Sequence, residues 1–307
     1  MATRYGARYG VSIVPAAELG KTSHVNAFTT RQFFAADEEL SYRDPATYVQ
    51  RNVAAIHAQG GLVSWNHPFG ATTGRVTTGP AAVTRRRNVY AALAKQDVWG
   101  VDILEVGYAV RGSMGIEDHL ALWDTFSRHA RFLTGNGVSD SHDSAHDRLG
   151  FANEFVTGLW SPTTGLGDVL PALSAGRAWT RHARAWAGGR LDLVVDDTYL
   201  MGQVAVVGGG VHRLAVAADA LPPGSVVEVV AGPVDLQGVD PGTVVLQRLP
   251  ASAFGVAGVA GCTVDVSAST FVRVTVRSSA GTVIGVSNPV WLLLSAPPTG
   301  VPAPRRP

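Results

Sequence analysis

Short apolar runs alternate with longer amphipathic stretches over the first half of the chain. Apolar runs suited to β-strands lie at residues 10–16, 24–28, 61–65, 101–108 and 131–135. Between them, apolar side chains recur at helical spacing in residues 44–59, 81–96 and 116–130, which predicts amphipathic helices. Such alternation is typical of an α/β fold with parallel, buried strands, in which functional groups gather at the C-terminal strand ends.

The pattern changes after residues 165–180, where we expect a last helix and strand. From residue 190 on, Val-rich segments alternate with Gly, Pro and Asp turns, and their length of about five to eight residues is that of ordinary strands. This predicts a small all-β sandwich. We therefore expect an α/β unit over residues 1–188, a β-sandwich over residues 189–294 and a Pro-rich, disordered tail over residues 295–307.

Composition narrows the function classes. With 46% hydrophobic residues in 307, the chain can bury a sizeable core. Its 25 basic and 24 acidic residues leave a net charge of +1, so no long-range field would attract nucleic acid or an anionic membrane surface. No apolar run approaches the roughly 20 residues of a membrane helix. Since Cys262 is the single cysteine, a metal site would have to use His, Asp or Glu.

Metal-ligand side chains border several of the predicted strands. Asp140 and His142 follow residues 131–135, and in an extended chain a D-x-H pair lies on one face. Glu18, His24 and His67 border earlier strands. Each residue alone is better explained by turn hydrogen bonding or as an ordinary histidine. Together they predict a cluster of imidazoles and carboxylates suited to Zn, Mn or Fe.

A family resemblance adds to this interpretation. The segments "IVPAAEL", "HVNAF", "SWNHPF", "DILEVGY" and "GVSDSHD" occur in this order and resemble the PHP (polymerase and histidinol phosphatase) superfamily of metal-dependent hydrolases. "TSHVNAF" and the trailing β domain ending in "VSNPVWLLL" are similar to its carbaryl-hydrolase-like CehA/McbA branch. The resemblance implies a distorted (βα)7 barrel whose mouth holds two or three metal ions.

The resemblance also implies a role for each residue. Glu18 would be the bridging carboxylate, His24 and His67 ligands of one ion, Asp140 a ligand of the first ion and His142 a ligand of the third. The family's H-x-H motif and its second-strand histidine have no counterpart, because no histidine precedes His24. We therefore expect an incomplete barrel that keeps a single-ion site, produced by truncation or a mis-set start codon. Missing strands supplied by a second polypeptide are an alternative without support in the sequence.

Other polar residues admit two interpretations. Glu105 could support the site from behind or face the substrate, or it could form a salt bridge at a strand end. Residues 85–87 are three consecutive arginines that could hold an anionic substrate, although a solvated helix face is the default. Ser139 and Ser141 lie close to Asp140 and His142 in the sequence. Because neighbours along an extended chain face opposite ways, these residues cannot form a Ser-His-Asp relay.

The sequence thus predicts a metal-dependent hydrolase of phosphoester, carboxylic ester or carbamate bonds. A metal-activated hydroxide would attack a small-molecule substrate, with Glu18, His67, Asp140 and His142 as the catalytic set. The alternative is a catalytically impaired barrel fragment whose β-sandwich serves as a binding module. No secretion signal is visible in the N-terminal residues. A cytoplasmic location is the default expectation, and export stays open if a longer N-terminus carries a signal.

Overall fold

Strands dominate the computed structural model of the protein. The model describes residues 16–19, 24–28, 38–72, 74–95, 100–140 and 154–297. Strands take up 39% of these residues and helices 24%. A (βα)7 barrel devotes more of its chain to helices than to strands, so the expected barrel class is wrong for this chain.

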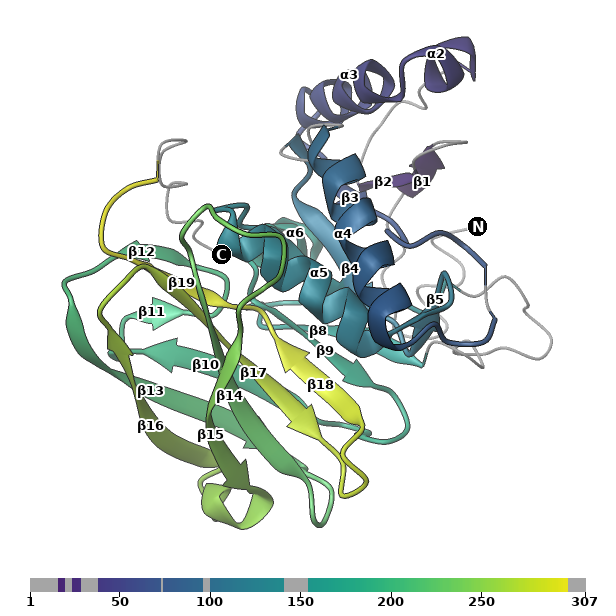
Figure 1. Ribbon diagram of the computed structural model, residues 1–307. Helices are drawn as coiled ribbons and strands as arrows, with labels where there is room; N and C mark the ends of the chain where they lie inside the picture. Colours follow the sequence, from purple (N-terminus) through teal and green to yellow (C-terminus); the bar gives the residue numbers. More distant parts are fainter. Residues whose placement is uncertain are drawn as a thin grey trace.

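The N-terminal part contains an open five-stranded sheet in the order β1-β2-β3-β4-β7 (Figure 1). Its strands are β1 (Ala16–Leu19), β2 (Val25–Phe28), β3 (Leu62–Trp65), β4 (Ile103–Gly107) and β7 (Thr134–Gly137). The pairs β1–β2 and β2–β3 are antiparallel, whereas β3–β4 and β4–β7 are parallel. Among the described strands β1 and β7 do not pair with each other, so the sheet is not closed.

Connection length explains why β1 and β2 depart from the expected parallel arrangement. Residues 20–24 are all that separates the two strands, whereas a parallel pair needs a crossover of about a dozen residues or more. The expected first strand, residues 10–16, lies outside the described residues apart from Ala16. The strand that carries Glu18 is β1, which forms an antiparallel hairpin with β2.

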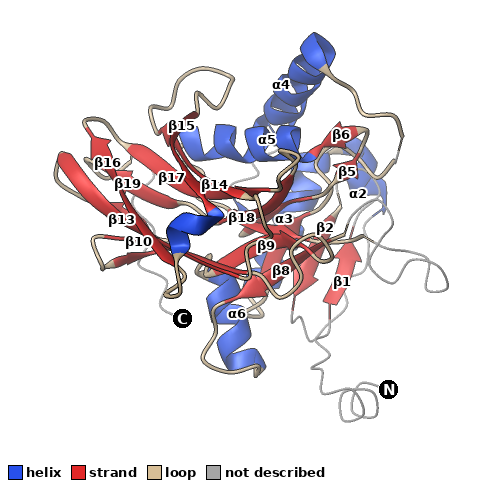
Figure 2. Ribbon diagram, turned by 90° about the horizontal axis from the view of Figure 1, so that it is seen from below, coloured by secondary structure: helices blue, strands red, loops and turns tan. Residues whose placement is uncertain are grey.

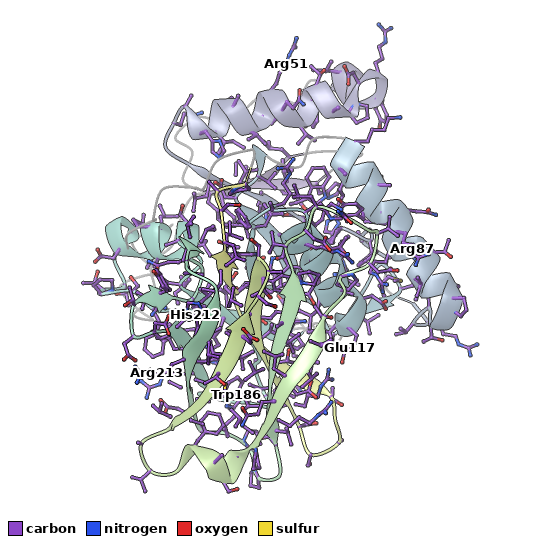
Figure 3. The ribbon with its side chains drawn as sticks, turned by 60° about the vertical axis from the view of Figure 1, so that its left-hand side comes forward. Arg51, Arg87, Glu117, Trp186, His212 and Arg213 are labelled. Atoms are coloured by element: carbon purple, nitrogen blue, oxygen red, sulfur yellow. The ribbon has the colours of Figure 1, made fainter. Side chains whose placement is uncertain are left out.

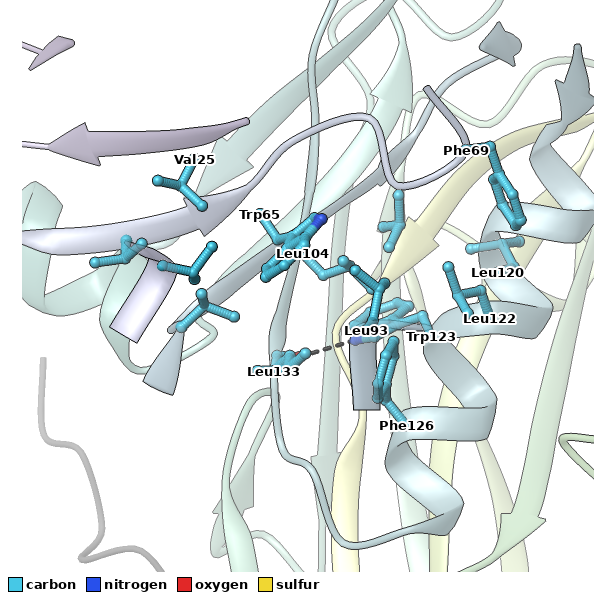
Figure 4. Packing of buried hydrophobic residues seen from close by; sticks show 14 of the residues in the cluster. Val25, Trp65, Phe69, Leu93, Leu104, Leu120, Leu122, Trp123, Phe126 and Leu133 are labelled. Atoms are coloured by element: carbon cyan, nitrogen blue, oxygen red, sulfur yellow. Dashed lines mark hydrogen bonds between the residues drawn. The ribbon is translucent and has the colours of Figure 1, made fainter. Parts of the chain in front are cut away.

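Helices cover one face of this sheet. They are α2 (Glu38–Arg43), α3 (Pro45–His57), α4 (Gly79–Lys95) and α5 (Ile116–Arg128). The predicted helix at residues 44–59 is confirmed as α3, where the Asp44 side chain caps the first turn by accepting from Thr47 N at 3.1 Å. Trp65 and Leu104 from the sheet share one core with Trp123 of α5 (Figure 4). The strand side chains that face these helices are therefore apolar.

The opposite face of the sheet meets a different set of elements. Ile103 of β4 packs with Leu173 of α6 (Leu166–Ser174) and with Ala178 of β9 (Ala178–His182). Figure 2 shows α6 on the side of the strands away from α4 and α5. Since side chains alternate along a strand, Glu105 shares this second face with Ile103. The face is apolar at the end with Ile103 and polar at the end with Glu105.

Residues from Arg190 on, together with two earlier strands, form two packed sheets (Figure 1). The smaller sheet has the order β11-β10-β13-β16, with β11 (Tyr199–Leu200), β10 (Arg190–Val195), β13 (Gly210–Asp219) and β16 (Val259–Val266). The larger contains β12 (Val204–Val206), β19 (Val290–Leu293), β17 (Thr270–Arg277), β18 (Val283–Ser287), β14 (Val226–Pro233), β15 (Val244–Pro250), β9 and β8 (Phe155–Leu159). One hydrophobic core joins both sheets. Because β8 and β9 belong to the larger sheet, hydrogen bonding continues across residue 188, the expected division of the chain.

Ion pairs tie the helices to the sandwich. Arg273 of β17 binds Asp124 of α5 through two hydrogen bonds of 2.8 and 2.7 Å, and both side chains are buried. Arg86 and Arg87 of α4 both pair with Asp240, and Figure 3 shows Arg87 on the outer side of its helix. This tie to Asp240 favours a structural role for the arginine run over an anion-binding one.

The remaining short elements are the hairpin of β5 (Val110–Arg111) and β6 (Met114–Gly115), and the 3-10 helix η2 (Ala251–Phe254). Within the described ranges, no helix is both long and apolar enough to cross a membrane. Most of the expected C-terminal tail, from residue 298 on, lies outside the described residues.

Candidate metal centre

Three strands bring Glu18, His24 and His67 to one edge of the five-stranded sheet. Glu18 lies near the end of β1, and His24 immediately precedes β2. The backbone N–H of Asn66 donates to the carbonyl of His24 at 3.0 Å, which extends the β2–β3 pairing by one step. His67 follows directly. The hairpin and the next strand therefore converge on a single point.

The ligand atoms of these three residues lie within 4.8 Å of one another. His24 Nδ1 is 3.1 Å and His67 Nε2 is 3.4 Å from the same Glu18 oxygen, Oε1. The two imidazole rings have centroids 4.7 Å apart and planes inclined by 67°. Metal bonds of about 2.0–2.2 Å place neighbouring donors of a tetrahedral site about 3.3–3.6 Å apart. Both His–Glu distances are close to this spacing, so the group could hold a divalent ion.

The protonation states also suit metal binding. Burial alone would raise the pKa of Glu18, but the hydrogen bond from Asn66 Nδ2 at 2.9 Å and the adjacent His24 and His67 outweigh burial and lower this pKa. Burial and the neighbouring His24 lower the pKa of His67. At neutral pH, Glu18 is thus a carboxylate and His67 a neutral imidazole, the forms that bind metals.

A buried network lies behind His67. Glu105 Oε2 accepts a hydrogen bond from the backbone N–H of His67 at 2.8 Å and another from the Tyr108 hydroxyl. Burial raises the pKa of Glu105 to about 7, although these two hydrogen bonds act in the opposite direction. The Tyr108 ring in turn lies 5.1 Å from the buried His119 ring. The network reaches from the edge of the sheet to α5.

Asp140, an expected ligand, is engaged by an arginine. Its carboxylate forms an ion pair with Arg111 of the β5–β6 hairpin. Its charge nevertheless acts to raise the pKa of His67, so Asp140 lies near the cluster without belonging to the three-residue group. His142 lies outside the described residues. Metal binding by Asp140 and His142 stays a prediction.

Several polar residues near the cluster were not singled out from the sequence. They are Asn66, Tyr108 and His119, which no sequence motif indicates as site residues. Asn66 stands two residues after Ser64 on β3, and Glu105 stands two after Ile103 on β4. Extending the strand alternation by one step beyond β3 would have placed Asn66 on the polar face with Glu105. No such strand alternation in the sequence indicates that His119, which is fully buried on α5, lies near the cluster.

Comparisons with known proteins leave the family open. No protein-family model and no curated protein matches the chain. Among solved structures, the soluble domain of PmoD from Methylocystis sp. ATCC 49242 (Rockwell) is similar over 34% of this chain and 90% of that chain, at 13% identity. The TM-score of this match is 0.24, which is too low to support an argument about fold or function.

Proposed function

We propose that the protein is a metal-dependent hydrolase that binds one divalent ion, Zn, Mn or Fe, through Glu18, His24 and His67. The observation that carries this proposal is the convergence of the three ligand atoms within 4.8 Å. Two imidazoles and one carboxylate form a donor set typical of catalytic zinc, which keeps a further position open for water or substrate. Structural zinc sites, in contrast, have four protein ligands.

The burial of the three side chains suits a reaction with a dissolved substrate. His67 is 8% exposed, whereas the Glu18 and His24 side chains are 41% and 31% exposed. His67 would therefore anchor the ion from the protein side, and Glu18 would face the solution from which substrate arrives. When bound, a divalent ion lowers the pKa of a coordinated water toward about 7 and polarises a phosphoryl or carbonyl oxygen.

Substrates of this site would be small esters: phosphoesters, carboxylic esters or carbamates. The resemblance of "IVPAAEL", "HVNAF" and "SWNHPF" to the PHP hydrolases supports hydrolysis over metal binding alone. These three segments contain the three residues that the structure brings together.

Metal content and hydrolysis of the purified protein test the proposal. We expect about one zinc or manganese per chain and chelator-sensitive cleavage of p-nitrophenyl phosphate or p-nitrophenyl acetate. His67→Ala should lose both. His57→Ala is the matched control, because His57 is an exposed histidine on α3 that pairs with Asp102, and it should keep both.

Two results would count against the proposal. A His67→Ala variant with full metal content and turnover would remove the site assignment. Metal-free, inactive wild-type protein would favour the alternative of an impaired enzyme whose β-sandwich is a binding module.

A further inference from the structure

The backbone of His67 adopts a conformation that non-glycine residues avoid. Its φ is +26°, on the left-handed side of the backbone map, where the β-carbon of an L-residue is crowded. His67 is also buried, so its imidazole has little freedom to adjust independently. The direction of the imidazole toward Glu18 therefore depends on whatever holds this backbone in place.

The Glu105 side chain holds the backbone of His67 directly. The Glu105 carboxylate accepts the His67 N–H at 2.8 Å and is itself only 3% exposed. Glu105 stands on β4, the parallel neighbour of β3, at the step of the ladder beyond the Trp65–Leu104 pair. The bond thus takes the place of a backbone hydrogen bond just where β3 ends and the chain turns.

A second donor fixes the carboxylate. The Tyr108 hydroxyl donates to Oε2, the oxygen that accepts from His67, and Tyr108 is fully buried. No Lys, Arg or His side chain in the described part of the chain forms an ion pair with Glu105. A strand-end salt bridge, one of its expected roles, therefore does not account for this buried carboxylate.

We infer that Glu105 is a positioning residue, whose carboxylate holds the strained backbone of His67 so that the imidazole faces Glu18 and His24. Tyr108 anchors the carboxylate from behind. This inference rests on the metal site of the proposed function and adds the part of the protein that orients its buried ligand. Groups that orient a metal ligand in this way typically contribute about 10- to 100-fold to metal affinity.

Three variants separate positioning from stability. Glu105→Leu removes the acceptor and should weaken zinc binding about 10- to 100-fold, measured by competition with a chromophoric chelator. Glu105→Gln keeps a carbonyl oxygen in the same place and should recover most of the affinity. Ile103→Ala destabilises the same strand without contact to His67 and should leave zinc affinity unchanged.

Histidine NMR of the metal-free protein gives a readout that does not depend on zinc. The ring signal of His67 is identified by its loss in His67→Ala. It should shift or broaden in Glu105→Leu and stay in place in Ile103→Ala. If wild-type protein takes up no zinc, the proposed function fails, while the NMR comparison still decides whether Glu105 positions His67.

An unmoved His67 signal, with unchanged zinc affinity, in folded Glu105→Leu would overturn the inference. If Glu105→Leu does not fold, Tyr108→Phe decides, because it releases the Glu105 carboxylate from its second donor without touching His67. We expect a displaced His67 signal in that variant. A signal identical to that of the wild type would overturn the inference.

Discussion

Replacing Asp124 with leucine removes one half of the buried ion pair that joins α5 to β17. Arg273 is 6% and Asp124 2% exposed, and two hydrogen bonds of 2.8 and 2.7 Å connect them. Without Asp124 the guanidinium stays buried beside Thr275 and lacks a counter-charge. Breaking a pair of this kind costs about 3–5 kcal/mol, which we expect as the loss in free energy of unfolding.

The double variant Asp124→Leu/Arg273→Met tests whether that loss comes from the buried charge of Arg273, which Asp124→Leu leaves without a counter-charge. With both partners apolar, no buried charge remains, and such replacements are often neutral or stabilising by about 1–4 kcal/mol. We therefore expect urea unfolding, followed by circular dichroism, to show the double variant as more stable than Asp124→Leu alone.

Glu117→Gln is the matched control, because Glu117, labelled in Figure 3, also stands on α5 and pairs with Arg277 of β17. The Glu117 side chain is 60% exposed, and exposed pairs contribute about 0–1 kcal/mol. Equal losses in Glu117→Gln and Asp124→Leu would refute the argument from burial. So would a double variant no more stable than Asp124→Leu.

Two further predictions concern packing and pH. Gly135→Ala places a β-carbon 2.6 Å from the Trp123 ring, so we expect a loss of about 1–3 kcal/mol from overpacking in the same urea assay. His212 faces acceptors with both ring nitrogens, Asp196 Oδ2 at 2.6 Å and the carbonyl of Gly208 at 3.0 Å, and the Asp196 hydrogen bond raises its pKa. The wild type should be more stable than His212→Ala, and this difference should be complete below the ordinary histidine pKa of about 6.5. It should disappear as pH rises through the raised pKa of His212. A difference in stability that grows with pH would contradict this.

Local patterns predicted the helices better than the way the strands connect. Residues 81–96 and 116–130 show helical periodicity, and the structure has α4 and α5 there. Periodicity describes which face of an element is buried and carries little information on strand direction. Only seven residues, 17–23, separate the expected strands at residues 10–16 and 24–28. This connection is too short for a parallel crossover, so it already favoured an antiparallel hairpin over a βα unit.

The polar surroundings of the site depended on strand register. Which residue of β4 lies beside His67 is fixed by the β3–β4 pairing, and this pairing cannot be read from either strand alone. The sequence therefore identified Glu105 as a candidate and left its role open. The role of Arg111 could not be read from the sequence either, because its ion pair with Asp140 joins a hairpin to the end of a distant strand.

The open sheet also explains how three site residues can meet without a barrel. In a parallel barrel, ligands gather because every strand ends at the same rim. Here β1 ends at the edge where the antiparallel β2 begins, and β3, antiparallel to β2, ends there too. Glu18 and His67 therefore lie at strand ends, but His24 lies at a strand start. A cluster of metal-ligand side chains shows only that several strand termini lie at the same edge of a sheet. It supports a metal site, but it does not indicate that the sheet closes into a barrel.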